Sequence, residues 1–257
     1  MDKNYYVIEF SASGCQIDIR VNDIPVANFE VAGQASTVVP INYAIPFSGE
    51  QVVTGRITAL SGEEKIQKNA FLDFQVRCMG IDNGFSLKQD FEKYVIAIPE
   101  EESGDFSTFI AGHFHAEVPY EFAGWQDGLY INDIEDALPK LIAAYQRLAE
   151  AIENKDYQYF INAFRNRERI MNTAMYLGAV DSTARLEHYI EKFDSGFDDV
   201  KISENVIMQI AGGNRTVCLK KSNMEHALSV RNLALRKEIL LDLMFYMPKG
   251  KTAFELI

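Results

Sequence analysis

Apolar and polar residues alternate with a period of two along several segments in the first half of the chain. The alternation is clearest in residues 16–21, 51–60 and 70–78. Because successive side chains of a strand point to opposite faces, this pattern predicts half-buried β-strands. Pro25 has no N–H to donate, so the strand around it is expected at a sheet edge. Further strands are expected at residues 5–10, 24–26, 37–42, 94–98 and 107–117.

Turn-forming residues separate these segments. They stand at residues 11–14, 22–23, 49–50 and 61–64. Turns at intervals of about 8–12 residues are typical of a β-sandwich. No helical pattern separates the strands, which disfavours a parallel α/β sheet, although residues 85–94 are compatible with one short helix. We therefore expect an antiparallel β-sandwich domain over residues 1–124.

The second half begins with a helical pattern. Apolar residues at helical spacing predict three helices, at about residues 133–153, 157–176 and 181–196. The period then returns to two, and residues 206–210, 216–220, 227–235 and 239–247 predict a four-stranded antiparallel meander. No strand is expected between the third helix and this meander. The sequence thus predicts a second, α+β domain over residues 132–257, joined to the first by a linker at residues 124–132.

Charge is distributed unevenly between the two halves. Residues 1–130 contain 8 Lys and Arg against 19 Asp and Glu, whereas residues 131–257 contain 17 against 18. An acidic first half would repel phosphate backbones, so nucleic acid is not expected as a partner. The charge favours a basic protein partner, or serves solubility alone. Candidate contact residues in expected turns are Glu63, Glu64, Glu100, Glu101, Glu102 and Asp105.

Trp125 is the sole tryptophan and lies in the expected linker. A tryptophan between glycines is either docked at the domain interface or presented to a partner. We count it among the candidate partner-binding residues.

His113, His115 and Glu117 form the most suggestive chemical pattern. In a strand, a period of two would place the three side chains on one face. Two imidazoles and a carboxylate can bind a divalent metal with positions left open. The pattern resembles the H-x-H motif of cupins, but the glycine and the second histidine motif that accompany it there are missing. A strand that presents these side chains to solvent is the other interpretation.

The remaining chemical motifs argue mainly against particular kinds of site. Cys15, Cys78 and Cys218 are scattered without a C-x-x-C pair, which argues against disulfides and structural zinc. Nucleophile motifs such as G-x-S-x-G are absent, and no cofactor is expected. Arg165 and Arg169, four residues apart, share a helix face that either binds an anion, contacts the acidic domain or is simply solvated.

Localisation follows from what the sequence lacks. No apolar run is long enough to cross a bilayer, and the N-terminus has no secretion signal. We expect a cytoplasmic protein that does not contact membranes.

Residues 141–156, LIAAYQRLAEAIENKD, resemble the first helix of the nuclear-transport-factor-two-like (SnoaL-like) superfamily. This resemblance implies a cone-shaped α+β fold for the second domain. The superfamily includes enzymes, binding domains and immunity proteins of bacterial toxin systems, so it leaves function open. Our expectation is a non-catalytic protein-binding protein, one form of which is an acidic immunity or antitoxin-type protein. The alternative is a small-ligand-binding protein or metal-dependent enzyme that uses His113, His115 and Glu117.

Overall fold

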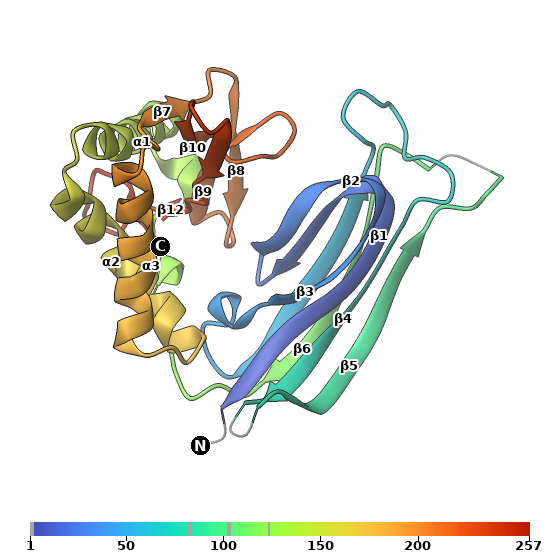
Figure 1. Ribbon diagram of the computed structural model, residues 1–257. Helices are drawn as coiled ribbons and strands as arrows, with labels where there is room; N and C mark the ends of the chain where they lie inside the picture. The colour runs from blue at the N-terminus through green and yellow to red at the C-terminus, as the bar shows by residue number, and fades with distance from the viewer. Residues whose placement is uncertain (1–2, 82–83, 102–103, 123) are drawn as a thin grey trace. The chain divides into compact units, whose positions relative to one another are not determined.

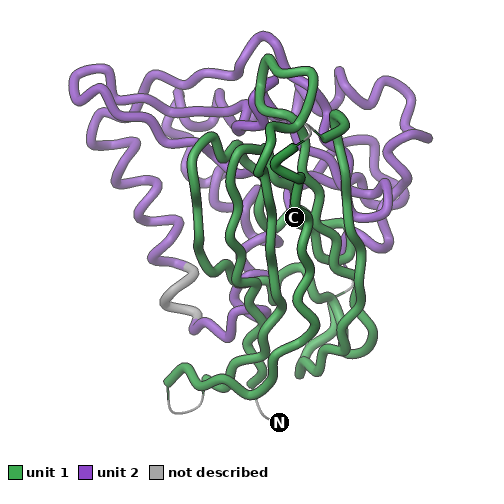
Figure 2. The backbone as a smooth tube through the Cα atoms, turned by 90° about the vertical axis from the view of Figure 1, so that its right-hand side faces the viewer, with its two compact units in different colours: residues 1–122 green, residues 123–257 purple. Residues whose placement is uncertain are grey.

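The computed structural model describes residues 3–81, 84–101, 104–122 and 124–257. The chain divides into two compact units, Met1–Phe122 and Ala123–Ile257, which are coloured green and purple in Figure 2. Strands make up the first unit, and helices followed by small antiparallel sheets make up the second (Figure 1). The α+β fold class predicted from the sequence is confirmed.

The first unit is a single antiparallel sheet organised around one long strand. Its strands are β1 (Asn4–Val21), β2 (Ile24–Pro40), β3 (Gly49–Thr58), β4 (Phe71–Gly80), β5 (Ser86–Ala97) and β6 (Ser107–Ala116). β1 pairs with β2 along one edge. On its other edge, residues 4–13 pair with β4 and residues 16–21 pair with β3. β5 and β6 extend these two arms outward.

The two arms pack face to face, so one continuous sheet supplies both layers of a sandwich. A Cβ at Gly55 of β3 would collide with the ring of Phe74 in β4, and one at Gly112 of β6 would collide with the Tyr94 phenol in β5. Only glycine permits this approach of backbone to ring. Residues such as Ile8, Phe10, Phe74 and Ile57 are fully buried between the layers.

Three local predictions in this unit are wrong. Residues 49–50 do not form a turn but are the first two residues of β3. Residues 11–14 do not form a turn, because β1 continues through them with a bulge between Ser13 and Cys15 and with Gly14 at φ +68°. A bulge lets a strand change direction without ending. Residues 85–94 do not form a helix but belong largely to β5, an edge strand that is paired with β4 in the described sheet. Pro25 does lie in a strand, β2, which among the described strands is paired with β1 alone, as expected for an edge position.

The second unit begins with three helices, α1 (Ala137–Glu153), α2 (Tyr157–Ala174) and α3 (Ala179–Asp194). The Asp156 carboxylate accepts a hydrogen bond from the Tyr159 amide and caps α2. The apolar faces of α1 and α2 bury Tyr145, Phe160 and Phe164. The Tyr145 hydroxyl accepts a hydrogen bond from the Leu219 amide at 2.9 Å, which ties α1 to a strand. No helix in the described part of the chain is long and apolar enough to span a bilayer.

Two small sheets follow the helices, in place of the single meander that the pattern predicted. The strands are β7 (Asp199–Ile202), β8 (Val206–Ala211), β9 (Thr216–Lys221), β10 (Leu228–Asn232), β11 (Lys237–Leu240), β12 (Phe245–Tyr246) and β13 (Glu255–Leu256). β8 and β9 pair as expected, but β9 continues to β12 and β13. β10 pairs instead with β11 and with β7, a strand the sequence did not reveal.

Candidate functional site

Two loops of the first unit meet at the end of its strands. The loop at residues 59–70 joins β3 to β4, and the loop at residues 98–106 joins β5 to β6. The Ile66 amide donates to the Asp105 carbonyl at 3.4 Å, and the Gly104 amide donates to the Ile66 carbonyl at 3.1 Å. Ile66 is fully buried beneath them. These contacts hold the two loops, here called the acidic loop pair, against each other.

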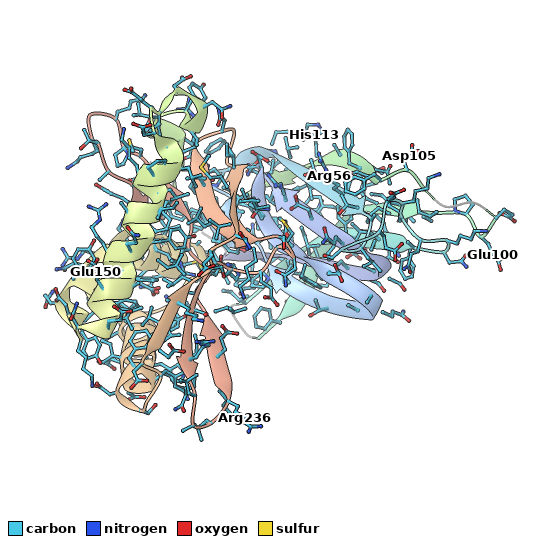
Figure 3. The ribbon with its side chains drawn as sticks, turned by 90° about the horizontal axis from the view of Figure 1, so that it is seen from above. Arg56, Glu100, Asp105, His113, Glu150 and Arg236 are labelled. Atoms are coloured by element: carbon cyan, nitrogen blue, oxygen red, sulfur yellow. The ribbon has the colours of Figure 1, made fainter. Side chains whose placement is uncertain are left out.

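The acidic loop pair carries most of the acidic residues proposed from the sequence. Glu63 and Glu64 lie in its first loop, and Glu100, Glu101 and Asp105 lie in its second, all of them exposed. Glu102 lies outside the described residues. Figure 3 shows Glu100 and Asp105 on the loop that extends beyond the strands. Within the described part of the chain none of these five carboxylates forms an ion pair, so their negative charge faces solvent.

Two lysines and a phenylalanine modify this surface. Lys65 and Lys68 lie in the first loop, and Lys68 Nζ donates to the carbonyl oxygen of Glu101 at 3.1 Å rather than to a carboxylate. The Phe106 side chain, next to Asp105, is 60% exposed. An exposed aromatic ring among charged side chains is a common feature of protein interfaces. Phe106 was not predicted from the sequence, because the sequence does not show whether a single phenylalanine is buried or exposed.

Trp125 lies in a short 3-10 helix, Trp125–Asp127, at the start of the second unit. Its side chain is 5% exposed. A Cβ at Gly212, in the β8–β9 turn, would lie 2.9 Å from its Cδ1 atom. The indole therefore packs closely on the backbone of that turn within its own unit.

His113 and His115 lie on the exposed face of β6, and Glu117 follows the strand. His113 Nδ1 is 4.0 Å from a carboxylate oxygen of Glu50 on β3. His115 and Glu117, but not His113, line a cavity of about 470 Å³ together with Tyr6 and Cys78. Among the described residues, no three His, Cys, Asp or Glu side chains are grouped closely enough to hold a metal ion.

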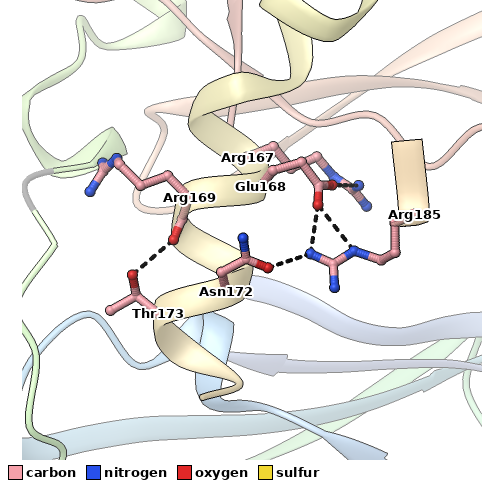
Figure 4. Close-up of polar contacts among 6 residues, drawn as sticks. All are labelled: Arg167, Glu168, Arg169, Asn172, Thr173 and Arg185. Carbon is pink, nitrogen blue, oxygen red and sulfur yellow. Dashed lines mark hydrogen bonds and ion pairs between the residues drawn. The ribbon is translucent and has the colours of Figure 1, made fainter. Parts of the chain in front are cut away.

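The helices of the second unit contain a buried carboxylate, Glu168 of α2 (Figure 4). Its Oε2 atom accepts hydrogen bonds from Nε and Nη2 of Arg185 in α3, at 3.0 and 2.5 Å. Nη1 of Arg167 lies 3.5 Å from Oε1, the other oxygen of the Glu168 carboxylate. Arg185 also donates to Asn172 Oδ1 at 2.7 Å. The buried carboxylate thus lies against two guanidinium groups from α2 and α3, which indicates a structural link between the two helices.

A second titratable cluster surrounds His226, which the sequence analysis did not single out. Its Nδ1 atom lies 3.2 Å from the amine of the buried Lys220 and 3.3 Å from a carboxylate oxygen of Asp242. Burial lowers the pKa of His226, and the lysine charge acts in the same direction against the opposing charge of Asp242. The cluster therefore disfavours protonation of the His226 imidazole relative to a free histidine.

Chemically distinctive groups thus occur in both units. In the described part of the chain, the five carboxylates of the acidic loop pair form no ion pair, whereas the Glu168 carboxylate pairs with two arginines. The cysteines are all buried, and burial raises the pKa of the Cys15 thiol to about 11 and also raises that of Cys78, which disfavours the reactive thiolate at both. No protein-family model matches the chain, and no match to it was found among curated proteins or solved structures.

Proposed function

We propose that the protein is a non-catalytic protein-binding protein, and that its acidic loop pair contacts a basic region of another protein. An immunity or antitoxin-type protein that neutralises a basic toxin is one form of this function. The observation that supports the proposal is the grouping of five exposed carboxylates, Glu63, Glu64, Glu100, Glu101 and Asp105, none of which has an ion-pair partner in the described part of the chain.

The arrangement of the loops suits recognition of a partner in three ways. Clustered charge of one sign speeds encounter with an oppositely charged partner, and salt screens this effect. The backbone hydrogen bonds between Ile66, Gly104 and Asp105 hold the loops in place before binding, which reduces the entropy lost on association. Phe106 adds an apolar group that a partner can bury.

The experiment compares two charge-reversal variants with the wild-type chain as bait in pull-downs from the native host. The loop variant carries Glu63→Lys, Glu64→Lys, Glu100→Lys and Glu101→Lys. The matched control carries the same number of reversals at exposed positions of the second unit, Glu153, Glu191, Glu204 and Glu238. We expect the wild-type chain and the control to recover the same basic protein, and the loop variant to lose it.

Kinetics with the recovered partner sharpen the test. The loop variant should associate more slowly than the control, and its association rate should depend less on salt. Repeated failure of the wild-type chain to recover any protein would contradict the proposal. Recovery of the same partner by the loop variant, with unchanged salt dependence, would contradict it equally.

A further inference from the structure

A pocket of about 480 Å³ lies in the second unit, between α1, α2 and the strands β12 and β13. Its floor is apolar and includes the buried side chains of Leu148, Phe245 and Phe254. Its rim is basic: Arg147 comes from α1, and Arg165 and Arg169 come from successive turns of α2. The pocket therefore combines a concave apolar floor with a basic rim, in a half of the chain that holds 17 Lys and Arg against 18 Asp and Glu.

Two of the three rim arginines form hydrogen bonds with neutral asparagine side chains and not ion pairs with carboxylates. Arg165 Nη2 donates to Asn162 Oδ1 at 2.5 Å, and Arg169 Nη2 donates to Asn166 Oδ1 at 3.1 Å. Amide oxygens fix the direction of a guanidinium but leave its charge uncompensated. Arg147 has no hydrogen-bond or ion-pair partner among the described residues. Glu255 also lines the pocket, but forms no ion pair with the rim in the described structure.

Several arginines elsewhere in the chain are paired with carboxylates, whereas Arg56 and Arg215 lie over aromatic rings instead. Arg20 pairs with Asp18 and Asp23, Arg77 with Glu9 and Asp90, and Arg231 with Asp199. With 37 acidic residues in the chain, carboxylate partners are plentiful. Like charges at four-residue spacing on a helix destabilise it slightly, so the Arg165 and Arg169 pair is unfavourable without a counter-ion. A simple solvated face would account for the arginines, but not for their convergence on an apolar pocket.

We propose that this pocket binds a small organic anion. A carboxylate, sulfonate or phosphate group would lie between Arg147, Arg165 and Arg169, where guanidinium groups donate charge-assisted hydrogen bonds. The apolar body of the ligand would rest on Phe245 and Phe254. The pocket is built entirely from residues of the second unit, so this binding does not depend on the acidic loop pair.

The test uses the full chain and 1-anilinonaphthalene-8-sulfonate, an aromatic sulfonate whose fluorescence rises on binding. The neutral N-phenyl-1-naphthylamine, which has the rings without the sulfonate, serves as its partner probe. The pocket variant is Arg147→Gln, Arg165→Gln and Arg169→Gln. The control removes three exposed charges of the same unit that lie outside the pocket, as Lys201→Gln, Arg236→Gln and Lys237→Gln.

The wild-type chain and the control should bind the sulfonate with equal affinity and one site per chain. The pocket variant should bind it at least about tenfold more weakly, while the neutral probe should bind both variants equally. On addition of the sulfonate, backbone NMR shifts of the wild-type chain should centre on Tyr159, Asn166 and Phe254. Equal binding by the pocket variant, an equal loss in the control, or shifts centred elsewhere would each overturn the proposal.

Discussion

Glu168 and Arg185 form a two-point contact in which the Nε and Nη2 atoms of one guanidinium donate to the same carboxylate oxygen. The carboxylate side chain is 5% exposed, whereas that of Arg185 is 35% exposed. Glu168 is the buried member of the pair, so its charge depends on Arg185 for compensation, whereas Arg185 is partly solvated. This contact joins α2 to α3. Elsewhere the two helices contact each other through aromatic rings, where Phe160 of α2 packs against Tyr189 and Phe193 of α3.

Arg185→Ala should destabilise the protein by about 2–4 kcal/mol, because it leaves the buried Glu168 carboxylate without its main counter-charge. The measurement is the free energy of unfolding in urea. Glu187→Ala, at an exposed position of α3, is the matched control and should change stability by less than about 0.5 kcal/mol. Equal effects of the two substitutions would show that the cluster is not a structural link.

Gly112→Ala and Gly55→Ala should each destabilise the first unit by about 1–3 kcal/mol or more, because a methyl group would collide with Tyr94 or Phe74. Gly33→Ala is the control, since nothing lies within 4 Å of a Cβ at that position of β2. It should be neutral or stabilise by about 0.5 kcal/mol. Thermal unfolding of the three variants checks the order. A Gly112→Ala variant as stable as Gly33→Ala would mean that the two layers are not packed as described.

Stability should fall as the pH drops below the ordinary His226 pKa of 6.5. The pKa is lowered in the folded protein, so the unfolded chain binds a proton at a pH where the folded chain does not. The contribution of His226 to the free energy of unfolding is therefore fully present above pH 6.5, and it is lost as the pH falls through the lowered pKa of the folded protein. Urea unfolding between about pH 5 and pH 8 should show a shallower decline for His226→Gln than for wild type. Parallel declines would contradict the lowered pKa.

Cys15, Cys78 and Cys218 should be unreactive toward Ellman's reagent in the native protein and should all react in denaturant. All three are buried, and burial raises the pKa of Cys15 and Cys78, which disfavours the reactive thiolate. Counting released thiolate with and without urea provides the measurement. A thiol that reacts rapidly in native buffer would show that its site opens to solvent.

The alternating segments were predicted well because burial of one face imposes a period of two. Residues 16–21 lie in β1 and residues 51–58 lie in β3, and buried and exposed positions alternate in both segments. The predicted segment 51–60 ran two residues past the end of β3. The helices were found for the same reason, since α1 buries Leu141, Tyr145, Leu148 and Ile152 along one stripe. Where one face meets a core, the sequence carries the pattern of the element.

The pattern fails where an element has no buried face or is very short. Residues 86–90 of β5 are exposed one after another, so their side chains carry no alternation and resemble a polar helix. β7 is only four residues long and has no fully buried side chain. Which strand pairs with which is decided by long-range contacts, and this is why the expected meander separated into two sheets.

The candidate sites were also predicted only as far as local sequence allows. Acidic residues in turns were visible in the sequence, but the hydrogen bonds that join residues 59–70 to residues 98–106 were not. Arg165 and Arg169 were recognised as neighbours because helix geometry places them on one face. Arg147 belongs to another helix, and only the packing of α1 against α2 brings it to the same pocket.

β1 is hydrogen-bonded to β4 over one part of its length and to β3 over the next, so the two arms of the sandwich share a strand. Its hairpin with β2 closes through Asn22 and Asp23, both at positive φ, and is the most local pairing available to the chain. Folding should therefore begin at this hairpin, with each arm added later at greater cost in loop closure. Melting of β1 removes the pairing partner of both arms at once. Amide protons of β3 and β4, which form no ladder with each other, should consequently exchange with solvent in a single cooperative event.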